Sequence, residues 1–297
     1  PLHDPALMRF YREKSGILNV QTKRGCPMHC AYCTYPMLEG ACMRFRQPDR
    51  VVEELRRLHR DFGVDNVFMT DSIFNDPRGE YRLLAEALIR ADVPVRWGAY
   101  FTPFRLTAED LALCKRAKLY AAELGTDAAS DATLAGMRKA FDWEAVRRAT
   151  DAFARTEIPC AQFVMFGGPG ETMETLEEGL RNIQGLPRTI VFGFSGVRAF
   201  PGTAIRTQGV AEGLFPADAP PLDPIYYISP GVNKEAMDQR IATAWAGHRD
   251  RVFPPEEGAR TVRMLRAFGH KGLLWDKLLD QDRVDSRAAR RRQRKRE

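Results

Sequence analysis

The sequence predicts an α/β fold, a partial (β/α)6 TIM-type barrel followed by a mainly helical C-terminal extension. Six short runs rich in β-branched and aromatic residues alternate with longer helical patterns, which indicates parallel strands joined by helices. After Pro201 this alternation gives way to a proline-rich stretch and then to helical patterns. Polar residues also recur near the carboxyl end of each run, where a parallel barrel places its active site. They are Gln21, Asp71, Tyr100, Glu123, Gln162 and Arg198. For any single one of them, the alternative is a hydrogen-bonded position in the core.

The individual elements follow from local patterns. The expected strands are ILNVQTK (17–23), NVFMTDS (66–72), VRWGAYF (95–101), YAAELGT (120–126), CAQFVMFGG (160–168) and TIVFGFSGVRAF (189–200). The expected helices cover residues 48–62, 80–91, the segment after Thr107, 130–155, 171–183 and about 233–282. Thr107 followed three residues later by Asp110 is typical of a helix N-terminus.

These patterns divide the chain into four expected segments. We expect a linker over residues 1–14, the barrel over 15–203, the helical extension over 204–282 and a disordered basic tail over 283–297.

The net charge of +6 is concentrated at the C-terminal end. Residues 286–297 hold seven basic residues and one acidic residue, which leaves 38 of each in residues 1–285. A terminal basic run is usually a solvated tail, and weak contact with RNA or anionic lipid is the alternative. The body shows no strong nucleic-acid signal. No apolar run approaches the roughly 18 to 20 residues that span a bilayer. Six cysteines without a disulfide pattern favour the cytoplasm.

Three cysteines lie close together, as Cys26-x3-Cys30-x2-Cys33, on the loop that leaves the first strand. A structural zinc site needs four ligands, usually in two pairs, and the sequence has no second pair. His29 and Cys42 are the remaining candidates for a fourth ligand. Closely spaced thiolates are also the usual ligands of iron–sulfur clusters. Three of them would leave one iron of a four-iron cluster open to another ligand.

The segment CPMHCAYC (26–33) resembles the CxxxCxΦC signature of radical S-adenosylmethionine (SAM) enzymes. The resemblance covers roughly residues 15 to 230 and is strongest to the branch whose members carry a cobalamin-binding domain. It also includes TYPMLEGACMRFR (34–46), ELGTDAASDATLAGMRKAF (123–141), FGGPGET (166–172) and RAFPGT (198–203).

The resemblance implies roles for particular residues. The three cysteines would bind a 4Fe-4S cluster, whose open iron would take the amine and carboxylate of SAM. Tyr32 would lie near the adenine, and Lys139 would pair with the SAM carboxylate. Glu123 is expected to contact SAM and to take part in catalysis. The remaining expected cofactor-binding residues are Asp71, Gln162, Gly168, Glu171 and Arg198. Asp71 stands where many relatives have a GGE-type segment, so its role is the least supported by the pattern. The alternatives are packing for Tyr32, a core ion pair for Glu123, a surface charge for Lys139 and an ordinary turn around Gly168.

The function implied is reductive cleavage of SAM and functionalisation of an unactivated carbon in a small, lipid-like or other molecule, by cobalamin-dependent methylation or C–C bond formation. An electron donor such as flavodoxin or ferredoxin would be needed. One alternative is a methylthiotransferase-like enzyme acting on tRNA or protein. The other is a non-catalytic iron–sulfur electron-transfer protein with Cys42 as fourth ligand.

The first residues, PLHDPALMRFYREK (1–14), resemble the linker that leads into the barrel in two-domain relatives. We therefore expect that cobalamin, if used, binds a domain preceding this chain. The alternative is a lone radical SAM domain that works without a corrin.

Overall fold

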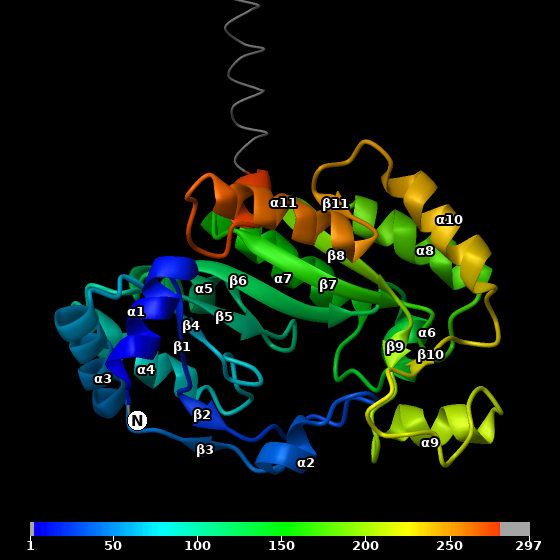
Figure 1. The fold of residues 1–297 in the computed structure, drawn as a ribbon, viewed down its shortest axis with the longest axis horizontal. Helices are drawn as coiled ribbons and strands as arrows, with labels where there is room; N and C mark the ends of the chain where they lie inside the picture. Colours follow the sequence, from blue (N-terminus) through cyan, green and yellow to red (C-terminus); the bar gives the residue numbers. More distant parts are fainter. Residues whose placement is uncertain (1–2, 280–297) are drawn as a thin grey trace, which may run out of the picture.

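The computed structural model describes residues 3–279, and its centre is a seven-stranded sheet. All six pairings between neighbouring strands are parallel (Figure 1). The strands in spatial order are β1 (Leu18–Val20), β4 (Asn66–Met69), β5 (Arg96–Phe101), β6 (Leu119–Asp127), β7 (Cys160–Phe166), β8 (Thr189–Ser195) and β11 (Arg251–Val252). The prediction of a partial parallel β/α barrel is confirmed.

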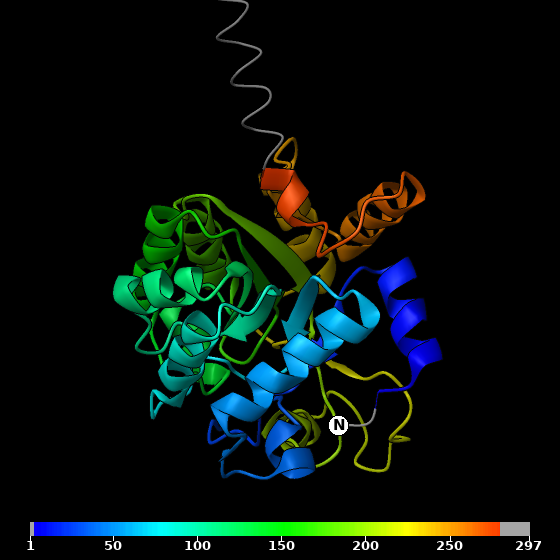
Figure 2. The same cartoon turned by 90° about the vertical axis from the view of Figure 1, so that its left-hand side faces the viewer.

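Helices follow the strands and pack around the outer face of the sheet (Figures 1 and 2). They are α3 (Pro48–Phe62), α4 (Glu80–Arg90), α5 (Ala108–Arg116), α6 (Asp131–Gly136), α7 (Trp143–Thr156) and α8 (Met173–Gln184). In α3 the buried residues Val51, Leu55 and Leu58 recur at helical spacing, and they join the core between sheet and helices. The capping box predicted at Thr107 and Asp110 is present at the start of α5.

The seventh strand differs from the sequence prediction of six. β11 belongs to the extension, which was expected to be mainly helical and to add no strand to the sheet, and it pairs with β8 through Arg251 and Val191. Two residues are too few to show a strand pattern, and one of them is an arginine. Arg251 is nevertheless buried, because its guanidinium donates hydrogen bonds to the carbonyl oxygens of Thr189, Ile183 and Leu186.

The rest of the extension is mainly helical, as predicted. It contains α9 (Ala204–Ala211), α10 (Lys234–Trp245) and α11 (Pro255–Ala267), and β10 (Tyr226–Tyr227) pairs antiparallel with β9 (Val197–Arg198). α10 packs on α8 and the end of the sheet through Met237, Ile241 and Trp245. In the described range, 3–279, no helix is long and apolar enough to cross a bilayer. The exact domain boundaries stay predictions, and the basic tail lies outside the described residues.

Side chains of the sheet alternate between the helix-covered face and the barrel interior. On β6, Leu124 belongs to the core under the helices, whereas Glu123 faces Trp275 of the C-terminal segment. Trp275 packs against Ala121, Ala161 and Ile190, which all lie near the N-terminal ends of their strands. The extension therefore closes the N-terminal end of the interior.

One helix precedes the sheet, and a two-stranded ribbon with a short helix follows its first strand. α1 (Pro5–Lys14) occupies the expected linker and is capped by the carboxylate of Asp4. The chain after β1 forms the ribbon β2 (Lys23–Arg24) and β3 (Arg44–Phe45), with the short helix α2 (Tyr35–Glu39) between the two strands. The three clustered cysteines lie on the segment between β2 and α2.

Candidate active site

The three clustered cysteines line one cavity of about 240 Å³ at the carboxyl ends of the strands. We call residues 25–33 the cysteine loop and this cavity the cysteine cavity. None of the three thiols is in a disulfide; Cys26 is buried, and Cys30 and Cys33 are partly buried. Neither Cys42 nor His29 is among the residues that line the cavity. Three thiols are therefore available from the chain at this place, as the spacing predicts.

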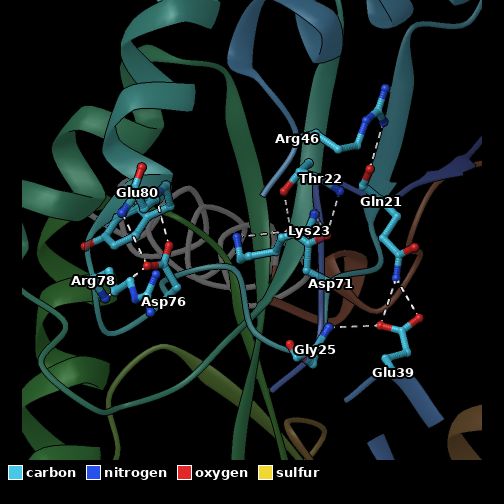
Figure 3. Close-up of polar contacts among 12 residues, drawn as sticks. Gln21, Thr22, Lys23, Gly25, Glu39, Arg46, Asp71, Asp76, Arg78 and Glu80 are labelled. Atoms are coloured by element: carbon cyan, nitrogen blue, oxygen red, sulfur yellow. Dashed lines mark hydrogen bonds and ion pairs between the residues drawn. The ribbon is translucent and has the colours of Figure 1, made fainter. Parts of the chain in front are cut away.

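Asp71 holds the base of the cysteine loop (Figure 3). Its carboxylate is fully buried and accepts hydrogen bonds from the backbone N–H groups of Thr22 (2.7 Å) and Lys23 (3.0 Å) and from the Thr22 hydroxyl (2.5 Å). The Lys23 ammonium lies 3.2 Å from the same carboxylate and is itself 2% exposed. A buried carboxylate is stable only when it is paired and hydrogen-bonded in this way. The contacts of Asp71, one of the expected cofactor-binding residues, are with residues of the chain itself.

The loop leaves this anchor through a conformation that only glycine adopts easily. Gly25 has φ of +87°, and a Cβ atom there would come within 2.2 Å of the Cys42 carbonyl oxygen. Its carbonyl accepts a hydrogen bond from the Ser72 hydroxyl at 2.9 Å, and the Cys26 N–H donates to the Gly40 carbonyl at 3.1 Å. The backbone that carries Cys26 is thus fixed on both sides.

The far end of the loop is held by two other elements. The Ala31 N–H donates to the Met137 carbonyl, and the Ala31 carbonyl accepts from the Ile205 N–H, both at 2.9 Å. Met137 is in turn backed by Gly168, where a Cβ atom would come within 3.2 Å of the Met137 sulfur. Gly168, predicted to lie near the cofactor, therefore supports the residue that holds the loop.

A charged group that lines the same cavity contacts Cys30. The Lys139 ammonium lies 3.6 Å from the Cys30 sulfur and is paired with the Asp127 carboxylate. The Tyr32 hydroxyl donates to the same carboxylate at 2.5 Å. Burial alone would lower the pKa of Lys139, but Asp127 and Cys30 outweigh it and the pKa is raised, so the side chain stays cationic.

Burial raises the pKa of the Cys30 and Cys33 thiols, while Lys139 opposes the rise. Binding of iron requires the thiolate form, and a bound cation supplies the charge that favours it. In the described part of the chain, no three histidine, cysteine, aspartate or glutamate side chains converge as ligands of one metal ion. In an iron–sulfur cluster with more than one iron, thiolates that share a cavity can each bind a different iron.

A second cavity of about 1010 Å³ lies between the last strands of the barrel and the extension. We call it the large cavity. Arg198, predicted to bind a cofactor, lines it together with Phe163, Phe194, Tyr226 and Phe253. Asp127 and Phe163 line both cavities, so the two are neighbours.

Three other predicted residues lie outside the linings of both cavities. Gln162 is fully buried and accepts a hydrogen bond from Thr126 (2.7 Å), while its amide donates to Thr150 (2.9 Å) and Thr189 (3.3 Å). Glu123 accepts from the Trp275 indole N–H at 3.0 Å; burial raises its pKa and this bond partly offsets the rise.

The sequence pattern predicted that Glu171 begins a helix. In the structure Thr172 caps α8, which starts at Met173, so Glu171 precedes the helix. The Glu171 carboxyl instead folds back onto the N–H groups of Gly167 and Gly168. Burial raises its pKa to about 7.

Asp127 was not predicted from the sequence as a site residue. It contacts both Tyr32 and Lys139, whereas Glu123, the acid predicted on the same strand, contacts Trp275. Asp127 is the last residue of β6, beyond a bulge that shifts the pairing with β7 between Leu124 and Asp127, and its own backbone has φ of +64°. Its position directly after the expected strand 120–126, at the carboxyl end where a parallel barrel places its active site, is the signal that could have identified it.

Comparison with known proteins agrees with this geometry. Residues 20–183, more than half of the chain, match the Radical SAM superfamily. The chain therefore belongs to this superfamily, whose domain implies a 4Fe-4S cluster and SAM.

Particular relatives include a tryptophan 2-C-methyltransferase from Streptomyces laurentii, 28% identical over 65% of this chain and 34% of that protein. An anaerobic magnesium-protoporphyrin IX monomethyl ester cyclase from Cereibacter sphaeroides is 32% identical over 53% of this chain and 26% of that protein. The fold is similar to that of the radical SAM methyltransferase TsrM from Kitasatospora setae, solved with cobalamin and a 4Fe-4S cluster. The TM-score is 0.78 at 22% identity, over 95% of this chain and 62% of that one. The chain thus spans about a third or less of the two curated relatives.

Proposed function

We propose that this chain is the catalytic barrel of a radical SAM enzyme that cleaves SAM reductively and functionalises an unactivated carbon. The observation that carries the proposal is the presence of three free thiols on one cavity, on a loop fixed at both ends. Cys26, Cys30 and Cys33 would each bind one iron of a 4Fe-4S cluster. When bound, the cluster supplies the electron that breaks a carbon–sulfur bond of SAM.

The residues of the chain bind, orient and exclude water around that step. Lys139 offers a buried ammonium for the SAM carboxylate, and Tyr32 offers an aromatic face for the adenine. Asp127 keeps Lys139 in place and charged. Asp71, Gln162, Gly168 and Glu171 act through the backbone and side chains they hold rather than by direct contact. Glu123, whose carboxylate is hydrogen-bonded to Trp275, would take part in catalysis from the closed end of the barrel interior.

Methyl transfer with cobalamin is the form of the reaction best supported by the relatives, which include a tryptophan methyltransferase and a structure with cobalamin bound. C–C bond formation is the other form of the proposal. Nothing in the described part favours the electron-transfer alternative, because Cys42 is exposed and outside the cysteine cavity. No observation favours a methylthiotransferase.

The proposed partners follow from the chemistry. A small-molecule substrate is needed, and a flavodoxin or ferredoxin would deliver the electron. We place the reaction in the cytoplasm, where thiols stay reduced.

Anaerobic reconstitution with iron and sulfide tests the proposal. After reduction with dithionite, the protein should convert SAM to 5′-deoxyadenosine and methionine, measured by chromatography. A protein that carries a full cluster and forms neither product would contradict the proposal. Titration with hydroxocobalamin, followed by its absorbance after gel filtration, reports whether the barrel alone retains a corrin.

A further inference from the structure

The large cavity contains one arginine whose charge the described residues leave unneutralised. Arg198 lies on β9 with its guanidinium 4.9 Å from the ring centre of Phe200 and 5.7 Å from that of Tyr226. Between residues 3 and 279 it forms no ion pair with a carboxylate. Stacking between two rings holds the planar fork of an arginine in place without using its N–H donors.

The acidic residues around the cavity are committed elsewhere or lie at its rim. Asp127 is bound by Lys139 and Tyr32. Asp238 accepts hydrogen bonds from the Ser195 hydroxyl and from Lys234, the only other basic residue in the lining. The two remaining acids, Glu235 and Glu256, are exposed in the first turns of α10 and α11, where the helix dipole favours a carboxylate. Arg198 is therefore the lining cation that is free to bind an anion.

The remaining lining is largely aromatic and apolar. Phe163 stacks on Phe192 with ring centres 5.4 Å apart and 14° between the planes, which presents a rigid face to the cavity. Phe194, Met165, Tyr226 and Phe253 complete the wall. A volume of about 1010 Å³ is at the upper end of the range for small-molecule sites. Such a wall suits a flat apolar body, and Arg198 suits an acidic group at its edge.

Phe163 and Asp127 also line the cysteine cavity. A ligand held at Arg198 and lying along Phe163 would therefore present its far end to the place where SAM is expected. This arrangement separates the group that anchors the ligand from the carbon that reacts.

We infer that the large cavity binds the substrate, an aromatic molecule with an anionic group, and that Arg198 holds this group. The inference rests on the proposed function, because it assigns the substrate class of that reaction. Arg198 is then a specificity residue of the substrate site rather than a contact of SAM.

Two dyes with the same ring system test the inference in the reconstituted protein. 8-Anilinonaphthalene-1-sulfonate carries an anionic group, whereas N-phenyl-1-naphthylamine is its uncharged counterpart. The substitution Arg198→Gln should weaken binding of the sulfonate about tenfold or more, as expected for loss of a charge-assisted hydrogen bond. It should change the affinity for the neutral dye less than about twofold. Fluorescence titration measures both affinities.

The matched control is Arg105→Gln, because Arg105 is exposed and stacked on Phe104 at 4.9 Å but lies outside the cavity. It should leave both affinities unchanged. Equal weakening of the two dyes by Arg198→Gln would show a structural role and overturn the inference. An unchanged affinity for the sulfonate would overturn it as well, as would displacement of the sulfonate by hydroxocobalamin in equilibrium dialysis.

A second readout separates this inference from the proposed function. SAM should still alter the electron paramagnetic resonance spectrum of the reduced cluster in the Arg198→Gln protein. Loss of that effect in this variant alone would assign Arg198 to the SAM site and overturn the inference. If the unmodified protein fails to cleave SAM while the dye pattern holds, the proposed function fails and the anion site stands.

Discussion

The two sides of the barrel hold their parts of the site by different means. Around β1 and β4, one buried carboxylate, Asp71, binds two backbone N–H groups, a hydroxyl and an ammonium beneath the cysteine loop. Around β8 and α10, the wall of the large cavity is mostly aromatic, and its arginine has no acidic partner in the described chain. The side that carries the cysteines, where the cluster would bind, is held by hydrogen bonds and an ion pair within the chain. The side that would admit a substrate keeps the N–H donors of Arg198 available for a ligand.

The largest effect is expected at the cysteine loop itself. Cys30→Ala should abolish the iron–sulfur cluster and SAM cleavage, because a cluster with two protein ligands is not retained. The same holds for Cys26→Ala and Cys33→Ala. Iron analysis and the absorbance of the reconstituted protein measure the loss. Cys42→Ala is the control and should keep the cluster; a full cluster in the Cys30 variant would refute the ligand assignment.

The anchor of the loop comes next. Asp71→Ala should lower the free energy of unfolding by about 3 to 5 kcal/mol, because it leaves the Lys23 ammonium buried without a partner. Urea denaturation measures this. Asp92→Ala, which removes the exposed partner of Lys118, should have no comparable effect. Similar losses in the two variants would mean that the buried network is no stronger than a surface pair.

Glu171 sharpens the comparison, because it is buried like Asp71, whereas among residues 3–279 it accepts only backbone N–H groups and has no cation beside it. Its pKa rises from an ordinary 4.5 to about 7. The folded state therefore binds the proton more tightly, so the associated stability is present below pH 4.5 and is lost as the pH rises through 7. The loss should be about 3 kcal/mol.

Urea denaturation at pH 5 and pH 8 measures this dependence. Glu171→Gln, which cannot ionise, should remove that part of the pH dependence. A variant with the same pH profile as the unmodified protein would show that another group titrates.

The smallest effect is expected at the closed end of the interior. Trp275→Phe keeps a ring but removes the hydrogen bond to Glu123, and should lower the free energy of unfolding by about 1 kcal/mol. SAM cleavage should stay unchanged. Glu123→Gln, which keeps an acceptor, decides the predicted catalytic role of this residue. If Glu123 acts on SAM, cleavage falls in that variant while stability is kept.

Prediction from the sequence succeeded where the signal is local. The three cysteines lie within residues 26–33, and each expected strand or helix is recognised within one short segment; both correspond to features of the structure. Asp71 and Gln162 were recognised as unusual polar residues in strands, but a pattern cannot tell a polar group that binds a ligand from one that binds its own backbone. Here Asp71 holds Thr22 and Lys23, and Gln162 holds three threonines.

Features that depend on distant contacts were missed. β11 exists because Arg251 reaches three carbonyl oxygens more than sixty residues earlier in the chain, and no local pattern reports that. The importance of Asp127 lies in its ion pair with Lys139 and its hydrogen bond from Tyr32, and these two residues come from different segments of the chain. The large cavity likewise forms only when the extension packs on the barrel.

Closure of the N-terminal end by the segment that carries Trp275 has a kinetic consequence. A blind-ended chamber is filled and emptied through the same mouth, so molecules that share it must take turns. SAM, which we place at the cysteines beyond the wall of Phe163, would load before a substrate that occupies the large cavity. The spent nucleoside would leave after the product. The barrel would then bind and release its ligands in a fixed order, because Trp275 closes the end of the interior that lies away from the cysteines.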